Sequence, residues 1–213
     1  MNAIRVLQLI VLFLMLAVPV ILFNHLPDRL ATHWDSQGNV NGYMGKFWGL
    51  FLLPLLSIAL FVFFLLIPKI DPLKENIKGF IGYYEWFILI FLAFLAYVHF
   101  LSIAWNLGYK VSFISALMPA FAVLFYFVGI LMANAKRNWF IGIRTPWTLA
   151  NDKVWKRTHR IGSKLFKLGG VLCLFLVFLP RFAFAVFLVY VLGISIFLFV
   201  YSYIIYSKPS QYS

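Results

Sequence analysis

The sequence predicts an all-α membrane protein, a polytopic bundle of six transmembrane helices with both chain ends in the cytoplasm. Of its 213 residues, 64% are hydrophobic and only 11% are charged, whereas a soluble domain is about half apolar and about a quarter charged. A chain of this length cannot hide so much apolar surface from water, so lipid has to solvate most of it. The cations are distributed unevenly between the apolar stretches, and this predicts the orientation.

Six stretches have the apolar character of membrane spans, which need about 20 residues each. They cover residues 6–23, 47–67, 83–105, 113–133, 165–179 and 182–206. Only Pro180 and Arg181 separate the last two, which predicts a tight helical hairpin, because proline lacks a backbone donor and arginine is costly within a membrane. The first stretch is longer than the apolar part of a signal peptide and has no small-residue cleavage site before Asn24, so we predict an uncleaved anchor.

We divide the chain into two units. Residues 1–80 form an N-terminal two-helix unit with an extracellular loop at residues 24–46. Residues 81–213 form a four-helix unit with a basic cytoplasmic loop at residues 134–164. No linker rich in glycine, serine or proline separates the units, and no strong internal repeat supports an inverted-repeat transporter.

Lys and Arg residues concentrate on one side of the predicted membrane. With the N-terminus inside, 14 of the 18 fall in cytoplasmic segments, and the four outside are Arg29, Lys46, Lys110 and Arg181. Positively charged loops favour the cytoplasm, so both chain ends are predicted to lie there. Topology therefore accounts for the formal net charge of +12, and direct binding of nucleic acid is not needed to explain it.

The sequence carries none of the short motifs of common catalytic sites: no Walker loop, no dinucleotide-binding glycine pattern, no H-E-x-x-H and no G-x-S-x-G. A single cysteine, Cys173, excludes an internal disulfide framework and a multi-cysteine metal site. Glu85 and His99 lie in or beside the third span, where ionisable groups can serve transport, but no chain of such groups joins them. We therefore expect no enzyme, cofactor or metal, and keep a small membrane transporter or exporter as the alternative.

The loop at residues 24–46 is longer than a turn requires. Glycines give it positions that tolerate positive φ, and Asn41-Gly42 predicts a hairpin-type turn. His33, Trp34 and Asp35 form a compact polar and aromatic cluster. The histidines and aspartates of the loop match no established pattern of metal ligands. We expect the loop to fold over the outer end of the bundle, or to bind a partner outside the cell.

The basic loop at residues 134–164 begins with helix breakers at Gly142 and Pro146 and continues into an amphipathic helix. Thr148 or Asn151 can cap that helix. Its apolar face carries Val154, Thr158, Ile161, Leu165 and Leu168, and its other faces carry Lys153, Lys156, Arg157, Arg160, Lys164 and Lys167. We expect this helix to lie on the anionic inner leaflet or to dock a protein partner, with His159 as a packed or surface residue.

Two segments resemble the SdpI family of membrane immunity proteins. The first is similar to the short domain of unknown function at the N-terminus of that family and carries Leu26, Pro27, Asp28, His33, Trp34, Gly38, Gly42 and Lys46. The second resembles the family's other signature, a G-x-R-T-P-W-T run followed by V-W-x-x-T-H-R, and is the more specific. With the six spans, the resemblance covers nearly the whole chain.

The resemblance implies a specific function, which the composition of the chain alone does not indicate. Family members lie in the plasma membrane of Gram-positive bacteria and protect them against a secreted peptide toxin of the SdpC type, and some hold a cytoplasmic ArsR-like repressor at the membrane. On this basis toxin sensing falls to Pro27, His33, Trp34, Asp35, Gly38 and Lys46. Repressor docking and signalling fall to Asn138, Gly142, Arg144, Thr145, Pro146, Trp147, Thr148, Trp155, Thr158, His159 and Arg160.

Overall fold

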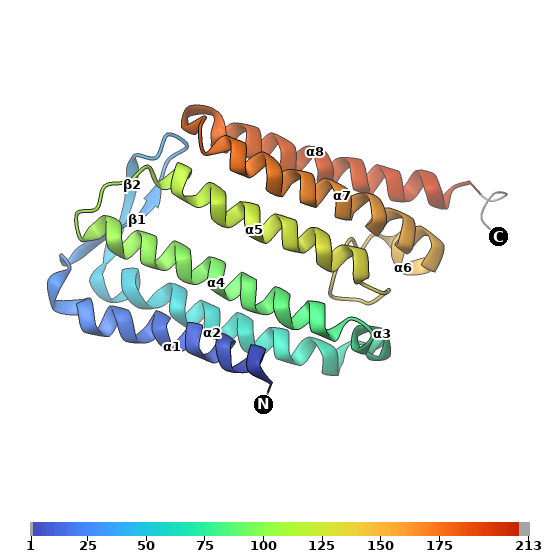
Figure 1. The fold of residues 1–213 in the computed structure, drawn as a ribbon, viewed down its shortest axis with the longest axis horizontal. Coiled ribbons are helices and arrows are strands. Elements are labelled where there is room, and N and C mark those ends of the chain that lie inside the picture. The colour runs from blue at the N-terminus through green and yellow to red at the C-terminus, as the bar shows by residue number, and fades with distance from the viewer. Residues whose placement is uncertain (1, 209–213) are drawn as a thin grey trace.

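The computed structural model describes residues 2–208, and these fold into an elongated helical bundle (Figure 1). In chain order its elements are α1 (Ala3–Leu22), η1 (Phe23–His25), β1 (Arg29–Trp34), β2 (Val40–Gly45), α2 (Lys46–Ile70), α3 (Lys74–Lys78), α4 (Ile81–Asn106), α5 (Phe113–Asn134), α6 (Pro146–Ala150), α7 (Asp152–Leu176) and α8 (Pro180–Tyr206). The six long helices contain the six predicted spans or most of each. The expected helix boundary at Pro180 is confirmed, since this proline occupies the first turn of α8.

Five helices of the described chain are long and apolar enough to cross a membrane, namely α1 with η1, α2, α4, α5 and α8. The sixth long helix, α7, differs because it also contains several basic residues, all of which lie between Lys153 and Lys167 in the first part of the helix. It is one continuous helix of 25 residues, so the basic segment extends the apolar segment along a single axis. The buried face of the basic segment packs into the bundle beside α5 and α8, and its position at the membrane surface stays a prediction.

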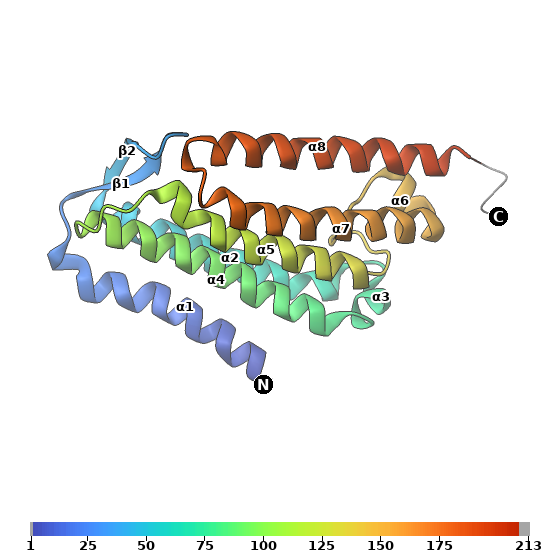
Figure 2. The ribbon, with the colours of Figure 1, turned by 45° about the horizontal axis from the view of Figure 1, so that its top comes forward.

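The long helices lie side by side along the long axis of the molecule (Figures 1 and 2). Helix α4 contacts α1, α2 and α5, and α7 packs against both α5 and α8. In Figure 2 α1 forms one edge of the bundle and α8 the opposite edge. Most large apolar side chains of α8 are exposed, as expected for a helix whose solvent is lipid.

Two glycines bring α5 and α7 into backbone contact. A Cβ on Gly129 of α5 would lie 2.7 Å from the Ser163 carbonyl oxygen, and a Cβ on Gly170 of α7 would lie 2.7 Å from the Ala122 carbonyl oxygen. Real Cβ atoms do not approach backbone this closely, so only glycine permits the contact. Small residues at helix interfaces commonly allow such packing in membranes.

The two ends of the bundle differ in structure and charge. One end, which we call the hairpin end, carries the β1–β2 hairpin and the α4–α5 and α7–α8 connections. The other, the loop end, carries α3, α6 and the connection between α5 and α7 (Figure 1). The cations at the hairpin end are Arg29, Lys46, Lys110 and Arg181, and the other cations of the described chain belong to segments at or near the loop end.

The prediction of an all-α chain is wrong in the segment between α1 and α2, which forms an antiparallel β-hairpin. The expected turn at Asn41-Gly42 is also misplaced, since both residues lie in β2 and the turn comes earlier, around Gly38 with its φ of 87°. The Asp35 carboxylate explains this choice, because Oδ1 accepts the backbone N–H groups of Gln37 and Asn39 at 2.8 and 2.9 Å. Such an Asx-type turn satisfies the backbone locally.

Candidate functional site

The β-hairpin is fixed to the bundle by α4. Asn106 accepts the Ala31 N–H through Oδ1 at 2.9 Å and donates from Nδ2 to the Ala31 carbonyl at 3.0 Å. Ala31 and its neighbour Leu30 are buried. At the turn, hydrogen bonds from the backbone of Asn39 and then Gln37 lower the pKa of the Asp35 carboxyl. The hairpin is thus a fixed cover over this end of the bundle.

A cavity of about 570 Å³ lies beneath the hairpin. Its walls come from β1, β2, α2, α4, α5 and α8, and most of the lining side chains are apolar. The lining residues are Thr32, His33, Trp34, Asp35, Ser36, Met44, Trp48, Gly49, Leu52, Leu53, Leu56, Val98, His99, Ser102, Phe113, Ile114, Leu117 and Phe184. A cavity of this size and character can accept part of an apolar molecule.

Two buried polar atoms in the lining lack a hydrogen-bond partner within residues 2–208. The first is Nε1 of Trp34, which is a donor, and the second is Nε2 of His99. The other ring nitrogen of His99 forms a hydrogen bond with the backbone of Met15. The Trp34 ring stacks on Phe113 at 3.8 Å between centroids, and His99 is only 2% exposed. Burying such groups unpaired is costly. A bound group that both accepts and donates a hydrogen bond, such as an amide, would satisfy both.

The structure brings together half of the residues expected to sense a toxin. His33, Trp34 and Asp35 all line the cavity. Lys46 lies outside it and pairs with Asp28 at 3.2 Å. The other two expected residues are Pro27, in the segment before β1, and Gly38, at the turn of the hairpin.

Sequence reasoning missed most of the cavity wall. His99 was considered only as a transport residue, and the residues of α2 and α5 that line the cavity were given no role at the site. Their shared cavity arises from the packing of α2, α4 and α5, and no local motif signals it. The stacking of Trp34 on Phe113 joins residues that are far apart in the chain.

Glu85 does not join His99 in a shared site. It lies near the start of α4, where Asn2 donates to its carboxylate at 2.6 Å and Arg5 pairs with it at 3.6 Å. Gln8 donates to its backbone carbonyl at 2.8 Å. Glu85 and His99 are separated by about 21 Å along α4 at 1.5 Å per residue. Glu85 therefore fastens α1 to α4, and the arrangement does not favour a transport pathway between the two groups.

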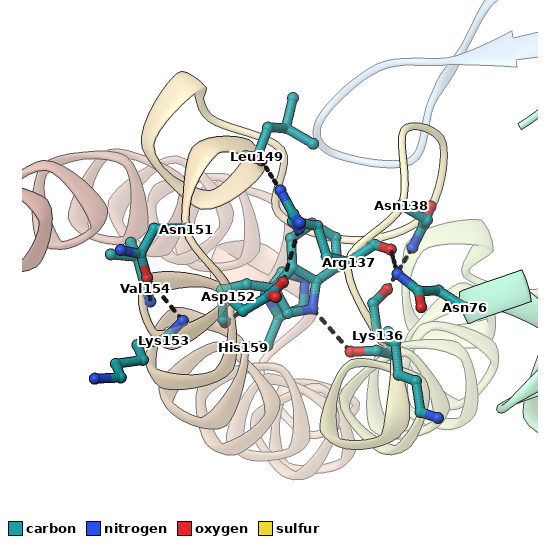
Figure 3. A network of polar contacts seen from close by, with 12 residues as sticks. Asn76, Lys136, Arg137, Asn138, Leu149, Asn151, Asp152, Lys153, Val154 and His159 are labelled. Carbon is teal, nitrogen blue, oxygen red and sulfur yellow. Dashed lines mark hydrogen bonds and ion pairs between the residues drawn. The ribbon is translucent and has the colours of Figure 1, made fainter. Parts of the chain in front are cut away.

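At the loop end, Asn138 organises the turn that follows α5. It is fully buried, and its Oδ1 accepts the N–H groups of Phe140 and Ile141 at 2.9 and 2.6 Å. Its Nδ2 donates to the carbonyls of Lys136 and Ile141, both at 2.9 Å. One side chain thus satisfies four backbone groups, which makes Asn138 a structural residue. Figure 3 shows it beside Asn76 and Arg137.

The threonines of the signature form the start of α6. Thr145 and Thr148 make a reciprocal capping box, in which each side chain bonds the backbone N–H of the other. The Thr145 hydroxyl also lies 3.0 Å from the Ser202 hydroxyl of α8. Trp147, which lies between the two threonines in the sequence, packs on Phe199 and Tyr203, with ring centroids 5.1 Å apart in each case. This part of the signature therefore attaches the loop to α8.

His159 closes the loop from α7. Its Nδ1 lies 2.9 Å from the carbonyl of Trp155, and its Nε2 accepts the backbone N–H of Ile143 at 3.0 Å. This pattern requires the neutral ring with the proton on Nδ1. Burial lowers its pKa to about 4, which keeps the ring neutral at physiological pH. Gly142 has a φ of 113° and no room for a Cβ, because that atom would overlap Nε2 of His159.

Burial divides the residues expected to dock a repressor into two groups. Asn138, Thr145, Thr148, Trp155, Thr158 and His159 are buried, so they shape the loop and cannot contact a soluble partner directly. Arg144, Pro146 and Arg160 are exposed, while Gly142 and Trp147 are partly exposed. Any docking surface formed by the signature therefore depends on this exposed minority, with the buried residues holding it in place.

Two family models match separate parts of the chain. Residues 10–58 match the model of a domain of unknown function, DUF1648, which covers most of α1, the hairpin and the first half of α2. Residues 134–207 match the model of the SdpI/YfhL protein family, which covers the signature loop, α6, α7 and α8.

One curated relative supports the same assignment. The Immunity protein SdpI of Bacillus subtilis (strain 168) is 24% identical over 166 residues, which are 78% of this chain and 77% of that protein. None of the solved structures matches the chain. The resemblance seen in the two signatures is confirmed by these matches to the SdpI/YfhL protein family and, ahead of it in the chain, to DUF1648.

Proposed function

We propose that the protein is a membrane immunity protein that protects the cell carrying it from a secreted peptide toxin of the SdpC type. The observation that carries this proposal is the similarity to an immunity protein over 78% of the chain. Its cavity at the hairpin end supports it, because an apolar peptide segment fits walls of this composition. The protein then acts by binding, without catalysis.

In this proposal six helices cross the plasma membrane, and both chain ends lie in the cytoplasm. The gathering of cations at the loop end supports that orientation. Helix α7 completes the sixth crossing with the apolar residues beyond its basic turns, since it runs beside α5 and α8. The hairpin end then faces the secreted toxin.

The same proposal assigns signalling to the loop end. The exposed residues Arg144 and Arg160, with the partly exposed Trp147, would contact a cytoplasmic ArsR-like repressor and hold it at the membrane. Signalling requires the toxin to bind one arrangement of the bundle better than another, because otherwise it shifts no equilibrium. The contact between α5, which lines the cavity, and α7, which carries Arg160, supports such a link.

Survival of a toxin-sensitive strain that expresses the protein tests the proposal. Two neighbouring leucines of α2 make a matched pair, since Leu56 lines the cavity and Leu55 does not, while their exposures are 49% and 48%. We expect Leu56→Trp to fill the cavity and abolish protection at equal protein level, and Leu55→Trp to leave protection intact. Equal protection by both variants would exclude the cavity, and no protection by the unmodified protein would exclude immunity to that toxin.

A further inference from the structure

A second cavity, of about 650 Å³, opens at the loop end between the end of α5, the start of α7 and α3. Unlike the cavity beneath the hairpin, its wall is rich in charge. The charged and polar side chains that line it include Asn76, Lys136, Arg137, Asp152, Lys156 and Arg160. His159 also lines it but adds no charge at neutral pH, because burial keeps its ring neutral.

The positive charge of this cleft is in excess. Arg137 pairs with Asp152 through Nε at 2.7 Å, and this pair is nearly neutral as a unit. Within residues 2–208 none of Lys136, Lys156 and Arg160 forms an ion pair. Three cations therefore share one concave surface. Like charges held in a cleft concentrate a positive potential that attracts an anion.

The cleft is built on fixed elements. Asn76 of α3 donates to the Arg137 carbonyl at 2.7 Å, and the Arg137 guanidinium donates to the Leu149 carbonyl at 2.7 Å, as Figure 3 shows. Asn151 caps α7 by accepting the N–H groups of Lys153 and Val154. Lys156 and Arg160 project from consecutive turns of that helix. The cations are therefore held around a preformed space.

Two features favour a lipid as the source of the anion. Met132 and Ala133, at the end of α5, form an apolar part of the wall beside the cations. Trp139 is 51% exposed in the adjoining turn, and exposed tryptophan at a span end is typical of the headgroup region of a bilayer. Basic pockets between membrane helices on the cytoplasmic side, where the proposed topology places this cleft, suit lipid headgroups. We propose that this cleft binds the phosphate headgroup of an anionic membrane lipid.

Native mass spectrometry of the purified full chain, with added phosphatidylglycerol or phosphatidylcholine, tests this proposal. We expect tighter binding of phosphatidylglycerol. Each of Lys136→Gln, Lys156→Gln and Arg160→Gln should weaken that binding about fivefold, and the triple variant about a hundredfold. Lys164→Gln, on the same helix but outside the cleft, and Lys74→Gln should change it less than twofold. An unchanged thermal midpoint of the triple variant would show that its fold is intact.

Several outcomes would overturn the proposal. Equal binding of the two lipids would remove the anion preference, and equal losses in the cleft and control variants would show only general attraction to charge. Displacement of the lipid by millimolar inorganic phosphate would assign the cleft to a soluble anion. Unchanged lipid binding by the triple variant would exclude the cleft as the lipid site, and an acidic protein segment would then be the candidate ligand of its cations. The test uses no toxin, so its failure is distinguishable from a failure of the immunity proposal.

Discussion

The rings of Trp155 and His159 stack one turn apart on α7, with centroids 3.9 Å apart and planes inclined by 19°. Both side chains also hold backbone outside the helix. Trp155 donates from Nε1 to the Ala135 carbonyl at 2.8 Å, and His159 accepts the Ile143 N–H. The stacked pair therefore joins the end of α5 and the signature loop to the first turns of α7.

Acid should weaken the fold through His159. Its pKa falls from 6.5 to about 4 on folding, so the folded state resists protonation that the unfolded state accepts. Stability is therefore fully present above about pH 6.5 and declines as the pH falls toward 4, by about 3 kcal/mol in total. Thermal unfolding in detergent across this range should show a smaller pH slope for His159→Leu. An unchanged slope would show that His159 does not account for the acid sensitivity.

Substitution of Gly142 should damage the loop from within. In Gly142→Ala the new methyl group meets the His159 ring in a backbone conformation that non-glycine residues disfavour, so we expect a loss of about 2 kcal/mol or more. Gly193→Ala is the control, because no atom lies within 4 Å of its new Cβ. Midpoints of thermal unfolding compare the two. A Gly142→Ala variant as stable as Gly193→Ala would contradict the described loop geometry.

Arg144 should matter for signalling and little for folding. Its side chain is exposed and makes one hydrogen bond, to the Trp139 carbonyl at 2.9 Å. We expect Arg144→Ala to cost less than about 1 kcal/mol and to keep its membrane level. A reporter gene under the repressor should lose its toxin response in this variant. Trp147→Ala should also lose the response, but with some loss of stability, since its ring packs on α8. Loss of Arg144→Ala protein from the membrane fraction would contradict a signalling role.

The Thr158 hydroxyl is buried without a hydrogen-bond partner in residues 2–208. Valine has nearly the same shape, so Thr158→Val removes an unsatisfied polar group without leaving a cavity. We expect the free energy of unfolding to stay equal or to rise by about 1 kcal/mol. A clear loss of stability would indicate a water or ligand at this hydroxyl, and unfolding of Thr158→Ser serves as the comparison that keeps it.

The helices were predictable because their signals are local. A run of apolar residues fixes α5 within one residue at each end of the predicted span, and Pro180 marks the start of α8. The hairpin was less predictable, because its short strands carry no clear alternation and its turn depends on one carboxylate, Asp35. Both parts of α7, the basic helix and the apolar span from residue 165, were predicted, but the sequence does not show that they share one axis, which the packing against α5 and α8 determines.

The candidate sites were predictable only in part. Trp34 belongs to a recognisable signature, but the cavity it shares with His99 depends on four helices that meet only in the folded chain. Likewise the signature identified His159 and Gly142, but not that one limits the conformation of the other. The sequence motif identifies these residues. Their burial, which only the structure gives, decides whether each residue contacts a partner directly or supports other residues that do.

The direct backbone contacts at Gly129 and Gly170 have a mechanical consequence. Because the two backbones approach so closely at these points, α5 and α7 cannot slide or separate without losing the contact, and we expect them to move together. The pair carries Phe113 in the cavity wall at one end and Arg160 at the other. We therefore expect a ligand that displaces the first end to displace the second as well.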